Sequence, residues 1–154
     1  MKAKQFLYRS ILFLGVFIFI TSCSSDDDDT SNTTTQNQLQ NNVQSGTWRI
    51  TNFIDSGTDE TYHFTGYQFT FNSSGVLTAD NGSVSYDGIW SITNSSSSSN
   101  SNSDLDFNIY FNLTNDFEEL NDDWDILSQS TTKIELMDVS GGNGGTDYLT
   151  FQKN

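Results

Sequence analysis

Apolar and polar side chains alternate with a period of two through most of the chain after residue 45, and this alternation restricts the fold most. The clearest run is Leu105–Leu113, where leucine, phenylalanine and isoleucine alternate with aspartate, asparagine and tyrosine. Successive side chains of a strand point to opposite faces, so such a run predicts a strand with one buried face. Similar runs, some less strict, begin at Trp48, Tyr67, Val76, Val84, Trp124, Ile134 and Tyr148.

Turn sequences separate these runs. Asn72–Gly75 is a tight turn, and Asn81-Gly82 is among the strongest hairpin signals. The low-complexity segment Asn94–Ser103 predicts a longer hairpin loop, and Asn115–Asn121 predicts one helical turn. About eight strands joined mostly by short loops predict an all-β fold, an antiparallel eight-stranded meander that closes into a barrel and leaves no free edge. A Greek-key β-sandwich is the alternative.

The first 22 residues have the pattern of a signal peptide. Three basic residues precede the apolar run Ile11–Ile20, which is shorter than the roughly 20 residues that a spanning helix needs. The following Ile20–Cys23 resembles the lipobox of bacterial lipoproteins. The resemblance implies cleavage before Cys23 and attachment of acyl chains such as palmitate, and two or three such chains hold a protein stably in a membrane. The alternative is an ordinary secretory signal.

An acidic run and a polar segment follow the cysteine. Ser25 and the four aspartates Asp26–Asp29 resemble the surface-export signal of Bacteroidota lipoproteins, which implies display on the outer face of the outer membrane. The alternative is a solvated start to a tether. Thr30–Ser45 is polar and nearly free of charge, which predicts a flexible tether. The predicted domains are therefore a signal peptide (1–22), a lipidated tether (23–45) and a barrel (46–154).

Charge excludes several partners. Beyond the signal peptide the chain has three basic residues, Arg49, Lys133 and Lys153, against 20 acidic ones, a net charge of −17. Such a surface repels phosphates, so nucleic-acid binding is excluded, and membrane contact must come through the lipid anchor. Cys23 is the only cysteine, so no disulfide forms within the chain and stability must come from a core.

Short motifs within the domain resemble those of lipocalins. Gly46-Thr47-Trp48 resembles the G-x-W of that superfamily, whose tryptophan closes the bottom of the barrel. Gly88-x-Trp90-x-Ile92, then Leu120–Trp124, then Leu149–Phe151 follow the order seen in lipocalin-like domains of Bacteroidota lipoproteins. The resemblance implies a small barrel that either fills itself with side chains or holds one small ligand. Two features depart from it: no closing helix is visible, and Lys153 lies too near the end of the chain to stack on Trp48.

Residues for catalysis or metal binding are scarce. His63 is the only histidine and the anchor uses Cys23, so a zinc site is not expected. The acidic loops Asp55–Glu60 and Asp122–Asp125 lack the spacing of an EF-hand. Gly141–Asp147 approaches the calcium β-roll repeat, but its aspartate is one place late and the unit occurs once. We interpret all three as solvated loops. No G-x-S-x-G elbow occurs, and His63 is expected in a strand with its ring satisfied. We therefore predict no enzyme activity, no cofactor and no metal.

An aromatic stripe is the remaining candidate site. Its members are either core residues or the lining of an apolar pocket at the open end of the barrel. The first function we expect is binding of a small apolar or amphipathic ligand. The alternative is a structural or interaction lipoprotein whose filled barrel contacts another envelope protein or a glycan. The candidate ligand-binding residues are Trp48, Tyr67, Phe69, Tyr86, Trp90 and Phe107.

Overall fold

The computed structural model describes residues 28–94, 105–139 and 144–154. The predicted signal peptide, Cys23 and Ser25 lie outside the described residues. So do most of the serine-rich loop and the first residues of Gly141–Asp147.

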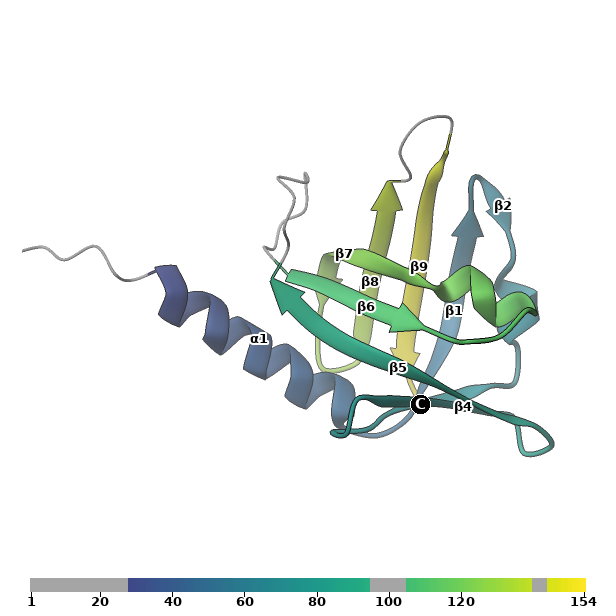
Figure 1. Cartoon of the computed structure of the whole chain (residues 1–154), viewed down its shortest axis with the longest axis horizontal. Coiled ribbons are helices and arrows are strands. Elements are labelled where there is room, and N and C mark those ends of the chain that lie inside the picture. The colour runs from purple at the N-terminus through teal and green to yellow at the C-terminus, as the bar shows by residue number, and fades with distance from the viewer. Residues whose placement is uncertain (1–27, 95–104, 140–143) are drawn as a thin grey trace, which may run out of the picture.

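The strands form one antiparallel sheet that closes on itself (Figure 1). Each strand of the barrel pairs with its neighbours in the chain, and the last strand returns to the first, so eight strands form a closed barrel. The predicted meander is therefore confirmed against the sandwich, and a two-residue strand, β2, is additional. The strands are β1 (Trp48–Asp55), β2 (Thr58–Asp59), β3 (Gln68–Phe71), β4 (Val76–Asp80), β5 (Ser85–Asn94), β6 (Leu105–Tyr110), β7 (Asp122–Gln129), β8 (Lys133–Val139) and β9 (Thr146–Lys153).

The shortest strand pairing in the barrel is that between β1 and β3. These two strands share a single register pair, Trp48 with Phe69. The short helix η1 (Thr61–Phe64) lies against β1 where the two strands are not paired. The hydroxyl of Thr61 accepts a hydrogen bond from the Phe53 amide at 2.8 Å, and the buried ring of Phe64 packs edge-on to Phe53 at 5.5 Å. η1 therefore supplies the packing that strand pairing does not.

The core is apolar: among the described residues, no polar or charged residue is buried. Every long strand contributes alternate residues to it, as the period-two pattern predicts. Position 88 of β5 faces inward, and it is occupied by glycine because a side chain would not fit there. An added Cβ would lie 2.6 Å from the Tyr110 carbonyl oxygen and 2.7 Å from a ring carbon of Phe111.

The structure corrects the prediction of a flexible tether over Thr30–Ser45, because the helix α1 spans Asp28–Gln44. Leu39 and Val43 are four residues apart on one face of α1, and both are buried in the barrel core. A polar helix of this length is not stable alone, but the barrel provides the apolar surface against which these two residues pack. No helix among the described residues is both long enough and apolar enough to span a membrane.

Candidate functional site

The structure brings the six predicted ligand-binding residues together as packed core. Trp48, Phe69, Trp90 and Phe107 are buried, while Tyr67 and Tyr86 are partly buried against the same cluster. The rings interlock: the Trp90 and Phe107 rings stack with centroids 6.0 Å apart, and both lie edge-on to a third ring, that of Phe71, at 5.4 and 5.6 Å. The aromatic surfaces that could contact a ligand instead contact one another.

One end of the barrel is closed at Trp48. Its indole nitrogen donates a hydrogen bond to the Val43 carbonyl of α1 at 2.8 Å. The Lys153 ammonium lies 4.8 Å from the Trp48 ring centroid and donates to the Ser45 hydroxyl at 2.7 Å. The expectation that no basic residue reaches Trp48 was therefore wrong, because β1 and β9 pair Trp48 directly with Lys153.

α1 is fixed across this end of the barrel by further hydrogen bonds. The Gln36 side chain donates to the Ile92 carbonyl of β5 at 2.8 Å. The Asn42 side chain donates to the Gln129 side chain of β7 at 3.2 Å. α1 therefore joins strand ends that are far apart in the sequence and covers this end of the barrel, which the sequence pattern did not reveal.

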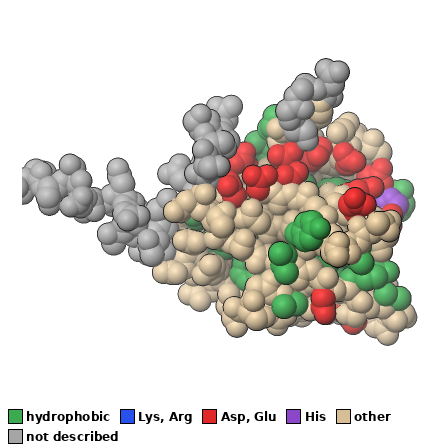
Figure 2. All heavy atoms as spheres, viewed as in Figure 1, with side chains coloured by type: hydrophobic (Ala, Val, Ile, Leu, Met, Phe, Trp, Pro, Cys, Tyr) green, Lys and Arg blue, Asp and Glu red, His purple; other side chains and the backbone are tan. Residues whose placement is uncertain are grey.

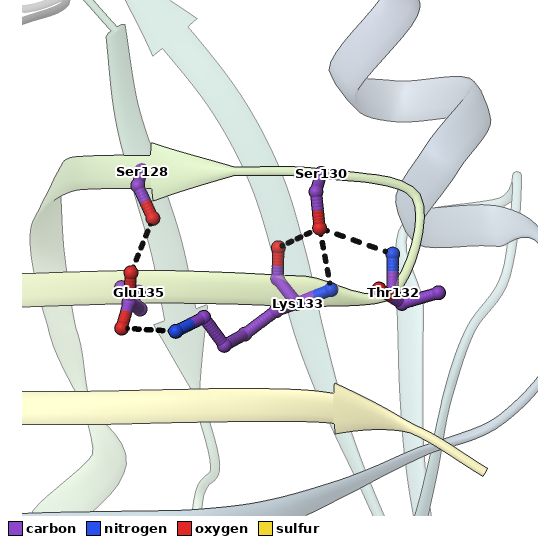
Figure 3. Close-up of polar contacts among 5 residues, drawn as sticks. All are labelled: Ser128, Ser130, Thr132, Lys133 and Glu135. Carbon is purple, nitrogen blue, oxygen red and sulfur yellow. Dashed lines mark hydrogen bonds and ion pairs between the residues drawn. The ribbon is translucent and has the colours of Figure 1, made fainter.

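The β7–β8 turn beside α1 is fixed by side chains (Figure 3). The Ser130 hydroxyl accepts from the amides of Thr132 and Lys133 at 3.2 and 2.9 Å. The Lys133 ammonium donates to Glu135 at 2.6 Å, and the Ser128 hydroxyl donates to the same carboxylate. These two hydrogen bonds, that from Lys133 being the stronger cause, lower the pKa of Glu135.

The opposite end of the barrel is closed by a second short helix, η2 (Asp116–Leu120), which confirms the helical turn predicted at 115–121. The Asn115 side chain caps it by accepting from the Phe117 amide at 3.2 Å. Phe117 and Leu120 are buried. The centroid of the Phe117 ring lies 5.0–6.2 Å from the centroids of five other aromatic rings. These rings belong to Phe64, Tyr67, Phe69, Tyr86 and Phe111.

His63 connects η1 to η2. Its Nε2 lies 2.7 Å from Glu60 Oε2, and its Nδ1 lies 2.8 Å from Asp116 Oδ2. The prediction of a satisfied ring is confirmed, but the prediction of a strand position was wrong, because His63 lies in η1. Both ring nitrogens therefore lie close to carboxylates, and His63 links η1 to η2.

Carboxylates gather at the η2 end. Burial, followed by the negative charge of Glu60, raises the pKa of Glu119. Burial, followed by the charges of Asp138 and Asp123, raises the pKa of Asp122 from 3.8 to about 6. Among the described residues, no group of three or more histidine, cysteine, aspartate or glutamate side chains could hold a metal ion.

We predict that Asp122→Asn stabilises the protein above about pH 6. Between about pH 4 and pH 6 the folded state binds a proton at Asp122 more readily than the unfolded state, so the contribution of Asp122 to stability falls as pH rises. Asparagine keeps the oxygen that accepts from the Asp123 amide. At about pH 7.5 we expect an unfolding temperature about 3 °C higher, with no gain at about pH 4. Thermal scans of Glu118→Gln, which removes an exposed charge nearby, provide the control. An equal gain at both pH values would contradict the prediction.

Comparison with known proteins adds one structural neighbour. No family model and no curated protein matches the chain. The crystal structure of a DUF4847 family protein from Bacteroides vulgatus is similar, with 16% identity and a TM-score of 0.44, over 73% of this chain and 94% of that one. The fold assignment rests instead on the strand pairing of this chain.

Proposed function

We propose that the protein is a lipoprotein of the outer membrane, displayed at the cell surface, whose lipocalin-like barrel is filled and acts without catalysis by binding another molecule through its exterior. The anchor and the surface display rest on the lipobox-like Ile20–Cys23 and on Asp26–Asp29. The observation that carries the filled barrel is that the chain closes its own barrel at both ends. Trp48 and α1 lie at one end, and Phe117 of η2 lies at the other. The interaction module is therefore favoured over the ligand carrier.

A ligand carrier would require a different interior. Ligand pockets typically enclose about 300–1,000 Å³, which is the volume of several aromatic side chains. Entry at the η2 end would require Phe117 to leave five ring contacts, and it would disturb the His63 bridge to Asp116. Entry at the other end would require α1 to withdraw Leu39 and Val43 from the core. Either route breaks packing contacts in the core, and a small apolar ligand would have to replace the stability that they provide.

We predict that the interior takes up no apolar dye. The mature chain carrying Cys23→Ser, which accepts no acyl chain, is titrated with an environment-sensitive apolar dye. Because Trp48, Trp90 and Trp124 are buried in the core, a ligand inside the barrel would quench their fluorescence. We expect neither saturable dye binding nor tryptophan quenching. Saturable binding that a fatty acid displaces, with quenching, would reject the filled barrel and restore the ligand carrier.

The anchor is tested by labelling bacteria with a fatty-acid analogue. The unmodified chain should take up the label and fractionate with the outer membrane, whereas Cys23→Ser should do neither. Replacing Asp26–Asp29 with asparagine should preserve labelling but abolish digestion by a protease added to intact cells. Ser31→Ala is the control for an ordinary substitution in this segment. Labelling of Cys23→Ser would refute the lipobox, and unchanged digestion of the asparagine variant would refute the export signal.

A further inference from the structure

The outer face of β4, β5 and β6 carries an exposed apolar row. Strand register places Val76 beside Ile89 and Ile89 beside Tyr110. Ile89 is 59% exposed and Tyr110 is 50% exposed, and both side chains alternate with the buried residues of their strands. Single exposed apolar residues are ordinary, whereas this row brings three apolar residues together across three adjacent strands.

Carboxylates flank this apolar row. Asp87 precedes Ile89 on the same outward face of β5. Towards β7, strand register pairs Asn108 with Asp123 and Asp106 with Asp125. Figure 2 shows the acidic side chains as a band along one border of this face, with hydrophobic side chains beside it.

Basic residues are absent from these strands. Residues 76–129 include ten acidic residues and no lysine, arginine or histidine. The three basic residues beyond the signal peptide lie together on β8, β9 and β1, because Arg49 and Lys133 both pair with Gln152 and Lys153 follows it. The outer face of β4–β7 is therefore acidic and apolar, and the three basic residues lie on other strands.

We infer that the outer face of β4–β7 binds a polypeptide whose surface presents lysine or arginine side chains around an apolar centre. The apolar row of Val76, Ile89 and Tyr110 would supply the desolvated centre of the contact, and the carboxylates would pair with cations at its rim. Opposite charge also speeds the encounter at low salt. This inference rests on the proposed function, because a filled barrel binds through its exterior.

The experiment measures binding of a designed probe to the full chain in a non-ionic detergent, with empty micelles as the blank. The probe is a short fluorescein-labelled peptide in which lysine alternates with valine, and a second peptide has serine in place of valine. Fluorescence polarisation gives the Kd at ionic strengths of about 0.01 M and about 1 M, where the Debye length is about 30 Å and about 3 Å.

Two double variants distinguish binding to this face from non-specific binding to any exposed apolar residue. Ile89→Thr with Tyr110→Thr removes the apolar centre while keeping a good strand residue. Val139→Thr with Tyr148→Thr removes two exposed apolar residues from β8 and β9, where Val139 is 60% and Tyr148 is 40% exposed. Thermal unfolding of each variant verifies that it is folded.

We expect the lysine–valine peptide to bind saturably, and we expect its Kd for the Ile89/Tyr110 variant to be at least tenfold higher. Its Kd for the Val139/Tyr148 variant should stay within about twofold of the parent value. The Kd should rise at least tenfold at high salt, and the serine peptide should bind the parent chain at least tenfold more weakly. Equal loss in both variants, binding insensitive to salt, equal affinity for the serine peptide, or no binding would each overturn the inference. Failure here without dye uptake leaves the filled barrel standing, whereas dye uptake rejects the proposed function itself.

Discussion

Replacing Phe117 with alanine will destabilise the protein by about 3–5 kcal/mol, the usual cost of removing a buried phenylalanine. Phe117 is 3% exposed and contacts five aromatic rings at the η2 end. Its loss leaves a cavity among side chains that strands of a closed barrel hold in place, so the site collapses only partly. Urea unfolding followed by tryptophan fluorescence measures the change.

Tyr110→Ala is the matched control for Phe117→Ala. It removes an aromatic ring of similar size that is half exposed, and we expect it to cost less than about 1 kcal/mol. The two variants also differ in their effect on the interior, since only Phe117→Ala opens space within the barrel. We therefore expect Phe117→Ala to gain apolar-dye binding that the parent chain lacks. A loss of stability below about 1 kcal/mol would show that η2 is not docked as described.

Replacing Leu39 and Val43 together with alanine will cost about 3 kcal/mol or more and will detach α1. Both side chains are fully buried, and a leucine-to-alanine change alone typically costs about 2–5 kcal/mol. Detachment removes the Val43 carbonyl that accepts from the Trp48 indole, so that end of the barrel opens to water. Urea unfolding gives the loss of stability, and a red shift of tryptophan emission reports exposure of Trp48.

Gln38→Ala with Asn41→Ala is the control for α1. Both residues are exposed on the same helix, and alanine favours a helix more than either, so we expect stability to stay the same or to rise slightly. Limited proteolysis separates the two interpretations of this segment. Cleavage within residues 35–44 should be slow in the parent and the control and rapid in the Leu39/Val43 variant. Rapid cleavage in all three would restore the flexible tether.

The sequence alone determined the strands and which of them are neighbours in a meander. Alternation with a period of two fixes which residues of Leu105–Tyr110 face inward, and short turns such as Asn81-Gly82 join strands that are adjacent in the chain. Asn115 likewise marks the start of η2 through a cap within two residues. These features depend on near neighbours in the chain, so a single sequence is sufficient to predict them.

Only the tertiary structure decided how the barrel is closed and filled. α1 has two apolar residues that gain stability only when a barrel end covers them, so its composition alone resembles a tether. The contact of Lys153 with Trp48 joins residues 105 positions apart, and the bridge from His63 to Asp116 joins η1 to η2. Such contacts depend on strand register and on the space left between elements, neither of which local patterning encodes. For the same reason, the sequence left open whether the aromatic residues line a pocket or pack against one another.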